Sequence, residues 1–222
     1  MSEISNQHKD VLAKLAAASK RGGREAADLV AVSKVQPDAR IAEMLKAGQH
    51  IFGENRVQEA QTRWGETFSD ARKDLELRLI GPLQTNKAAD AVALFDVIET
   101  VDREKLLKAL VKAAETVGKM PRLYVQVNTG EEAQKSGVLP AELPAFLKLM
   151  REVYKLKPEG LMCIPPAGEA ASPHFWMLSN LAEANGVEKL SMGMSADYET
   201  AAEMGATSVR VGSALFGVRD YN

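Results

Sequence analysis

Hydrophobic residues follow two different spacings along this chain. Short runs of consecutive apolar residues predict buried strands, whereas apolar residues that recur every three or four positions predict amphipathic helices. The two patterns alternate, and a helix predicted at residues 4–19 comes ahead of the first strand. The predicted strands are 29–34, 51–55, 77–81, 95–100, 123–128, 160–164, 189–192 and 207–211. The longer helices predicted between them are 57–64, 103–117, 141–154, 172–185 and 196–204.

The alternation predicts an α/β fold with a parallel sheet. Strands that are apolar on both faces are typical of a parallel sheet covered by helices. Eight strand–helix units close most naturally as a (β/α)8 TIM barrel, and 222 residues lie at the compact end of its size range. A doubly wound open sheet is the alternative, but it normally carries a glycine-rich phosphate turn after its first strand, and residues 33–37 lack one. We predict a single barrel domain over residues 1–222.

Composition narrows the classes of partner. The formal net charge is −2, and acidic and basic residues are interspersed, so we expect neither nucleic acid nor a membrane surface as a partner. One cysteine, Cys163, and three histidines predict neither a disulfide nor a metal site. The first residues lack the pattern of a signal peptide, and no apolar run has membrane-spanning length. We therefore expect a cytoplasmic protein.

Lys34 is the unusual residue of the first predicted strand, because it ends an apolar run with an ammonium group. The carboxyl ends of barrel strands carry the chemistry in enzymes of this fold. A partly desolvated lysine has a lowered pKa and can form Schiff bases with carbonyl compounds. The alternative is that Lys34 simply extends into solvent. Position alone favours the solvent alternative, and the motifs below favour the Schiff base.

Two loops near the end of the chain have the composition of an anion site. Met194 and Ser195 follow the seventh predicted strand, and Gly212 and Ser213 follow the eighth. Barrels commonly bind phosphate at these two loops. Ser195 is expected to cap the next helix with a spare hydroxyl. Each loop alone is typical of an ordinary helix cap, but the pair predicts a phosphate site.

Arg210 is predicted to point into the barrel, because it shares a strand face with Ser208 and Gly212 while the valines take the other face. A buried arginine needs an acceptor such as a carboxylate, a ring nitrogen or a phosphate. An ion pair with Glu54 or Glu99, both near strand ends, is the alternative to a ligand.

Asn55 closes the second predicted strand, next to the strand of Lys34. It either touches a ligand ring or caps the following helix, which is the more frequent role of asparagine at such a boundary. The segment 84–87 beyond the third strand either lines the barrel mouth or forms a solvated turn, and the sequence favours the turn.

Seven motifs, in order, span nearly the whole chain. They are AVSK at 31–34, FGENRVQE at 52–59, IGPLQTNK at 80–87, VN at 127–128 with KSG at 135–137, GLM at 160–162, LSMGMS at 190–195 with Asp197, and VRVGS at 209–213 with FG at 216–217. This set resembles the family of pyridoxal 5′-phosphate (PLP) homeostasis proteins. One departure is Pro82, where many members have histidine, which weakens any side-chain role at that position.

The resemblance implies a fold-type III PLP barrel, similar to the N-terminal domain of alanine racemase, without its C-terminal β-domain. It implies that Lys34 forms the Schiff base and that Arg210 faces the pyridine side of PLP, where an arginine disfavours protonation of the ring nitrogen and leaves a weaker electron sink. The remaining implied cofactor-binding residues are Asn55, Ser191, Met194, Ser195, Gly212 and Ser213, the last three at the phosphate.

The same resemblance implies a carrier that buffers PLP, maintains vitamin B6 and amino-acid/keto-acid balance, and has no catalytic residue. Its expected partners are PLP and PLP-dependent apo-enzymes, and its expected state is a monomer or weak dimer. A PLP-dependent amino-acid racemase is the main alternative. Two-base racemisation needs a second acid/base group, and beyond the last barrel motif only Tyr221 is available. A Schiff-base aldolase fits Lys34 and the phosphate loops equally well, and only the family motifs argue against it.

Overall fold

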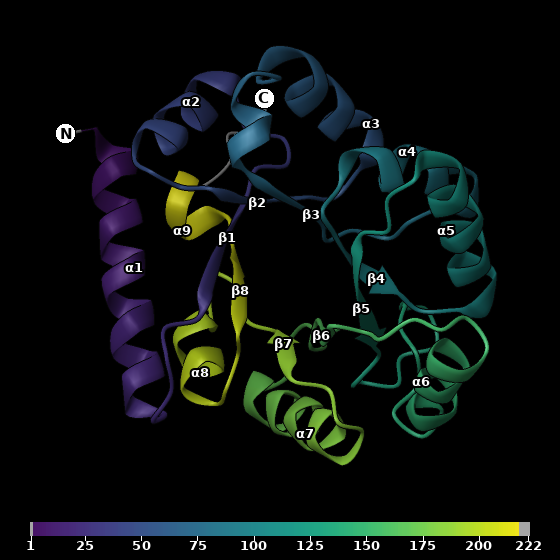
Figure 1. The fold of residues 1–222 in the computed structure, drawn as a ribbon. Helices are drawn as coiled ribbons and strands as arrows, with labels where there is room; N and C mark the ends of the chain where they lie inside the picture. Colours follow the sequence, from purple (N-terminus) through teal and green to yellow (C-terminus); the bar gives the residue numbers. More distant parts are fainter. Residues whose placement is uncertain (1, 218–222) are drawn as a thin grey trace.

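The computed structural model describes residues 2–217, which form a closed barrel of eight parallel strands in the order β1 to β8, surrounded by helices (Figure 1). The predicted TIM-barrel fold is thereby confirmed, whereas one domain over 1–222 stays a prediction. The strands are β1 (Asp28–Val32), β2 (Ile51–Glu54), β3 (Glu76–Leu79), β4 (Val97–Val101), β5 (Arg122–Val127), β6 (Gly160–Cys163), β7 (Lys189–Ser191) and β8 (Ser208–Val211).

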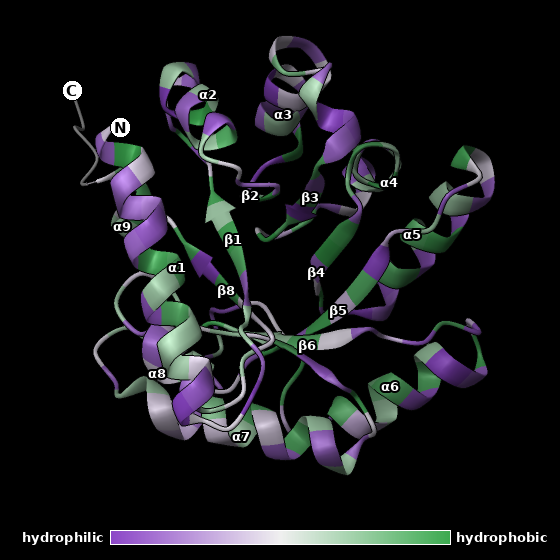
Figure 2. Cartoon of the chain, turned by 60° about the vertical axis from the view of Figure 1, so that its left-hand side comes forward, coloured by the Kyte–Doolittle hydropathy of each residue, from purple (hydrophilic) through white to green (hydrophobic). Residues whose placement is uncertain are grey.

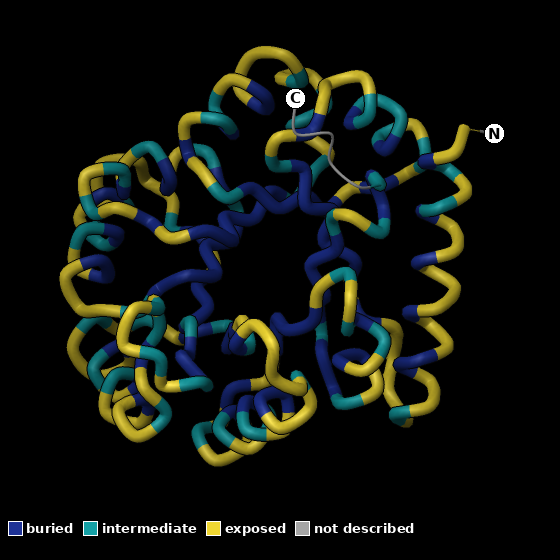
Figure 3. Tube along the Cα trace, turned by 180° about the vertical axis from the view of Figure 1, so that it is seen from behind, coloured by how far each residue is buried: buried dark blue, intermediate teal, exposed yellow. Residues whose placement is uncertain are grey.

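The helices lie outside the strand ring, where one face of each meets the sheet and the other meets solvent (Figures 2 and 3). They are α1 (Glu3–Arg21), α2 (Asp38–Lys46), α3 (Val57–Ala60), α4 (Ala88–Leu94), α5 (Glu104–Val117), α6 (Leu143–Glu152), α7 (Ala171–Ala184), α8 (Tyr198–Glu203) and α9 (Ser213–Phe216). Short 3-10 segments occupy Ala71–Asp74 and Thr85–Lys87. The helix predicted at 57–64 is α-helical only to Ala60 and continues as a π-helix over Gln61–Thr67.

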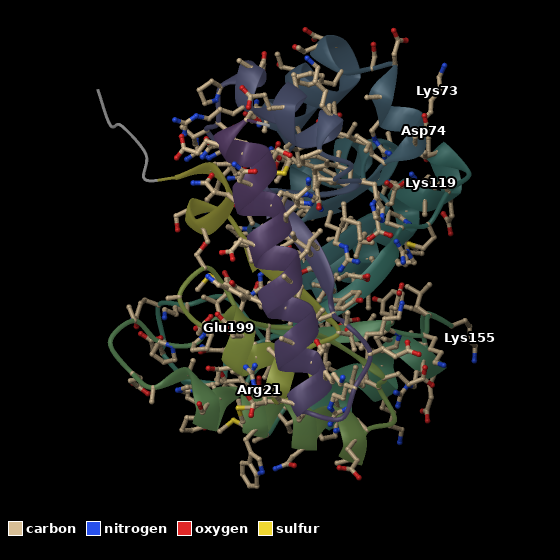
Figure 4. The ribbon with its side chains drawn as sticks, turned by 90° about the vertical axis from the view of Figure 1, so that its left-hand side faces the viewer. Arg21, Lys73, Asp74, Lys119, Lys155 and Glu199 are labelled. Carbon is tan, nitrogen blue, oxygen red and sulfur yellow. The ribbon has the colours of Figure 1, made fainter. Side chains whose placement is uncertain are left out.

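Local sequence explains where these helices begin, end and pack. Ser2 is the N-cap of α1, and its hydroxyl accepts a hydrogen bond from the Ser5 amide. Ion pairs then join the last turn of α1 to α8, since Arg21 lies 3.9 Å from Glu199 and 3.2 Å from Glu203 (Figure 4).

Among residues 2–217, no helix combines the length and apolar character needed to cross a membrane.

The interior of the barrel holds side chains from alternate strand positions. Val97, Tyr124 and Met162 form an apolar cluster there. Gly160 makes room for that cluster, because a Cβ atom at this position would lie 2.2 Å from the Tyr124 ring. The interior between these strands is therefore a filled core rather than a channel.

The first strand is shorter than predicted. It ends at Val32, so Lys34 lies in a turn two residues beyond the strand rather than at its last position. Val35 has a φ of 59°, a left-handed conformation that breaks the extended backbone. The prediction of a strand over 29–34 was wrong at this boundary, and the cause is local turn geometry.

Candidate functional site

A cavity of about 500 Å³ opens at the carboxyl ends of the strands. Seven of the eight residues predicted to bind a cofactor line it: Lys34, Asn55, Met194, Ser195, Arg210, Gly212 and Ser213. The eighth, Ser191, is buried beneath and bonded to Arg210. The cavity wall also includes Val32, Ile80 and Ile164, which were not predicted as site residues. Ile80 and Ile164 directly follow β3 and β6, and the strand alternation that placed Arg210 also predicts their inward direction.

The turn that carries Lys34 is held in place by one buried arginine. Arg63 donates from Nη1 to the Ser33 carbonyl over 3.1 Å and from Nη2 to the Gln36 carbonyl over 2.9 Å. The Val35 amide donates to Glu59 Oε1 over 2.6 Å. The backbone is therefore hydrogen-bonded on both sides of Lys34, and the half-buried lysine projects from this turn.

Arg63 is held in turn by Glu54. The fully buried Glu54 carboxylate accepts from Arg63 Nη1 over 2.7 Å, from Ser33 Oγ over 2.7 Å and from Trp64 Nε1 over 3.1 Å. Burial raises the pKa of Glu54 above its usual value despite the opposing charge of Arg63. Sequence reasoning missed Arg63. Glu54 was the signal that could have revealed it. Glu54 shares a strand face with Phe52, which packs against Trp64 beneath the helices, and a carboxylate buried there needs a cation such as Arg63.

Arg210 points into the barrel, as predicted, and its guanidinium has defined partners. Nη1 donates to Ser191 Oγ over 2.5 Å, and Nη2 donates to the Cys163 carbonyl over 2.7 Å. Ser191 donates onward to Glu99 Oε2 over 2.6 Å, and Glu99 lies 3.9 Å from Arg210. Of the two predicted carboxylate alternatives, Glu99 approaches Arg210, whereas Glu54 faces the helices and pairs with Arg63.

Cys163 is not a candidate nucleophile. Burial raises the pKa of its thiol to about 12, so it is neutral at physiological pH. It contributes its backbone carbonyl to Arg210 instead.

Ser195 connects the two loops that were predicted to bind phosphate. Its Oγ accepts from the amides of Gly212 and Ala214 over 3.2 and 3.3 Å. The prediction that it caps the next helix was wrong, because Asp197 is the N-cap residue of α8 and accepts from the Met194 amide over 2.6 Å. The structure places the Ser195 hydroxyl beside the first turn of α9, where backbone N–H groups point away from the helix and attract anions.

Asn55 does not cap α3. The N-cap position belongs to Arg56, and no side-chain cap bond forms there. The Asn55 Oδ1 atom is buried and has no hydrogen-bond partner among the described residues. A buried acceptor without a partner costs free energy of about 1–3 kcal/mol, so this atom marks a position where a ligand donor would be stabilising.

Comparison with known proteins identifies the family. The alanine racemase N-terminal domain family matches residues 9–220. The pyridoxal phosphate homeostasis protein of Pseudomonas aeruginosa is 40% identical over 100% of this chain and 98% of its own length. That of Escherichia coli K12 is 36% identical over 100% of this chain and 99% of its own length.

Solved structures agree in fold. PipY of Synechococcus elongatus PCC7942, solved with PLP bound, has a TM-score of 0.82 at 35% identity and covers 97% of this chain and 100% of PipY. An alanine racemase of Clostridium difficile 630 shares the barrel alone, with a TM-score of 0.66 at 17% identity, over 96% of this chain but 58% of that chain. The chain therefore belongs to the pyridoxal phosphate homeostasis protein family, within the wider group of alanine racemase N-terminal domains.

Proposed function

We propose that this protein binds PLP in the cavity beside Lys34 and carries it in a buffered form for PLP homeostasis. One observation carries the proposal: Lys34, Arg210 and the Ser195 hydroxyl, from distant parts of the chain, line one cavity. Relatives named pyridoxal phosphate homeostasis proteins and a PLP-bound neighbour support the same ligand.

The donor set of the cavity fits the chemistry of PLP. The hydroxyls of Ser195 and Ser213 would hold the phosphate at the start of α9, where the Gly212 and Ala214 amides donate to Ser195 Oγ and orient that hydroxyl. Asn55 lines the same cavity, and its buried Oδ1 has no hydrogen-bond partner within residues 2–217. Val32, Ile80 and Ile164 supply an apolar surface for an aromatic ring. When bound, PLP supplies an aldehyde, the carbonyl with which the Lys34 amine forms a Schiff base.

The chain's own residues orient that chemistry. Arg63 holds the turn of Lys34, so the amine has a defined position relative to the cavity. Arg210, held by Ser191 and the Cys163 carbonyl, presents a permanent positive charge, which disfavours protonation of a nearby pyridine nitrogen. A carboxylate in the position of Arg210 would instead favour protonation of that nitrogen. This arrangement supports a carrier rather than a catalyst that depends on a strong electron sink.

In this proposal the protein is not an enzyme, it works in the cytoplasm as a monomer or weak dimer, and PLP-dependent apo-enzymes receive its cofactor. Its relatives are named homeostasis proteins. Tyr221, the residue considered as a second racemase base, lies outside the described residues. Incubation of the PLP-loaded protein with single L-amino acids tests the distinction. No D-isomer is expected, and turnover to the D-isomer would establish the racemase instead.

The cofactor is tested by the absorption spectrum of the purified protein before and after borohydride. A visible band that bleaches on reduction, with the reduced adduct located on Lys34 by peptide mass spectrometry, is the expected result. Lys34→Ala should lose the band and keep the fold, whereas Lys73→Ala, a matched exposed lysine, should keep both. A wild type that stays colourless when PLP is added would overturn the proposal and favour an aldolase or a simple phosphate-binding barrel.

A further inference from the structure

A second and larger cavity, of about 760 Å³, opens at the same end of the barrel. We call it the basic cavity. Its walls come from the loops after β2, β3, β4 and β5, whereas Lys34, Ser195 and Gly212 belong to the loops after β1, β7 and β8. The residues that line the basic cavity are Asn55, Arg56, Val57, Gln58, Pro82, Leu83, Gln84, Lys87, Arg103 and Ser136. The two cavities therefore lie over different strands of the barrel mouth.

The charge of this lining is one-sided. It includes Arg56, Lys87 and Arg103, and none of its described residues is acidic, although the whole chain has a net charge of −2. Arg56 is exposed and has no ion pair with a described residue. Like charges gathered in a concave surface repel one another and attract an anion from solution.

Arg103 and Lys87 are positioned by their neighbours. Arg103 donates from Nη2 to the Leu83 carbonyl over 2.9 Å and from Nη1 to Asp102 over 2.5 Å. Lys87 lies 3.4 Å from Asp90. The side chain of Lys87 is 33% exposed and that of Arg103 is 43% exposed, so a small ligand can reach both charged groups.

Asn55 connects the two cavities, because it lines both of them. Its buried Oδ1 has no hydrogen-bond partner among the described residues. The Asn55 residue therefore lies where a ligand of either cavity would contact it. The basic cavity thus offers cations at its wall and the side-chain amides of Gln58 and Gln84, whose carbonyl oxygens accept hydrogen bonds.

From these observations we propose that the basic cavity is a binding site for a small organic dianion that also carries a hydroxyl or ammonium donor. Arginine forks bind carboxylates and phosphates with paired hydrogen bonds, and lysine adds a point charge. The volume is that of a metabolite site. Two sources share this chemistry, an amino dicarboxylate and a hydroxylated phosphate monoester. The site goes beyond PLP binding and does not require it.

Isothermal titration with L-aspartate and with glycerol 3-phosphate tests the site. Each probe is titrated into the wild type as purified and into protein whose cofactor cavity has been filled by PLP and fixed with borohydride. Filling keeps a phosphate probe out of the loops at Ser195 and Gly212. If borohydride attaches no PLP to the protein, the proposed function is contradicted. The titration of the protein as purified then still shows whether the basic cavity binds a probe.

We expect one of the two probes to bind saturably, and the probe that binds identifies the class of ligand. Combining Arg56→Gln with Lys87→Gln should lower the affinity for that probe by about tenfold or more. The matched control combines Lys73→Gln with Lys155→Gln, two exposed lysines that precede β3 and β6 and so lie at the opposite end of the barrel from the basic cavity (Figure 4). It should bind as the wild type does.

Three outcomes would overturn the site. Neither probe binds the wild type; the Arg56 and Lys87 changes leave the affinity unaltered; or the control loses as much affinity as the cavity variant, which would show attraction by overall charge alone.

Discussion

Arg78 and Arg210 both point into the barrel and both approach Glu99, from opposite ends. Arg78 lies towards the amino ends of the strands, where it pairs with Glu76 over 2.6 Å, Glu99 over 3.1 Å and Asp28 over 3.5 Å. Arg210 lies towards the carboxyl ends, and its two hydrogen bonds go to neutral oxygens, with Glu99 at 3.9 Å.

The difference separates a structural charge from one that a ligand can use. Burial alone would lower the pKa of Arg78, but Glu99 and Glu76 outweigh it and raise the pKa above its ordinary value. The charge of Arg78 is therefore matched within the protein. Arg210 is similarly buried, but its hydrogen bonds go to neutral oxygens and its nearest carboxylate, Glu99, lies 3.9 Å away. The charge of Arg78 is therefore matched at close range by carboxylates, whereas the charge of Arg210 is matched less closely and lies at the wall of the cavity.

The largest effect is expected from Arg78→Leu. Removing this cation leaves the fully buried Glu99 with only the more distant Arg210, at 3.9 Å, as a counter-charge, so the free energy of unfolding should fall by about 3–5 kcal/mol. Urea unfolding at pH 7 measures it, with Lys73→Gln as an exposed control that should change stability by less than about 0.5 kcal/mol. A loss below about 1 kcal/mol would show that Arg78 is not the main structural charge.

At the other end, Ser213→Asp should weaken PLP binding by roughly 100-fold, or about 2.7 kcal/mol, because a carboxylate beside the phosphate loops repels the ligand. Stability should hardly change, since an acidic residue is favourable in a first helical turn. PLP titration followed by absorbance measures the affinity. Ser213→Asn, which has a similar size and no charge, is the matched control. Equal affinity for both variants would remove this loop from the site.

Arg210→Leu should lower stability by less than Arg78→Leu, about 1–2 kcal/mol, because Glu99 keeps its bonds to Arg78 and Ser191. The same variant should shift the absorption maximum of the PLP-loaded protein, since a positive charge leaves the cavity wall. Urea unfolding and the spectrum report the two effects separately. A stability loss equal to that of Arg78→Leu would break the contrast between the two arginines.

The smallest effect is expected from Glu76→Gln, and it depends on pH. Burial disfavours the charged form of Glu76, but Arg78 and Arg122 outweigh it and hold the pKa of its carboxyl below the usual value. A lowered carboxyl pKa stabilises the fold above the unfolded-state pKa and loses that contribution as pH falls. Glu76→Gln should therefore cost about 1 kcal/mol at pH 7, and this cost should shrink as pH falls below the usual carboxyl pKa and through the lowered folded-state pKa. A cost independent of pH would point to packing.

The spacing of apolar residues predicted which strands exist better than it predicted the residues at which they end. All eight strands lie where apolar runs predicted them, because burial in a parallel sheet demands apolar residues. The alternation of strand faces likewise predicted that Arg210 points inward. The end of β1 was misplaced, since the left-handed Val35 follows from turn contacts with Glu59 and Arg63 that apolar spacing does not encode.

Residue types also predicted which loops carry the candidate site, but not their bonds. Ser195 was expected to cap its own helix. In the structure it accepts from amides 17 and 19 residues further along the chain. Asn55 was expected either to touch a ligand or to cap a helix; it does not cap α3, and its Oδ1 has no hydrogen-bond partner among the described residues.

By itself, the sequence determined the barrel, the lysine after its first strand and the inward arginine of its last, because each follows from strand period and order along the chain. The tertiary structure alone decided which groups meet: Arg63 with the turn of Lys34, Ser191 with both Glu99 and Arg210, and Ser195 with the start of α9. Closure of the barrel brings loops from its first and last strands together, and the distances between their atoms depend on that closure rather than on any local pattern.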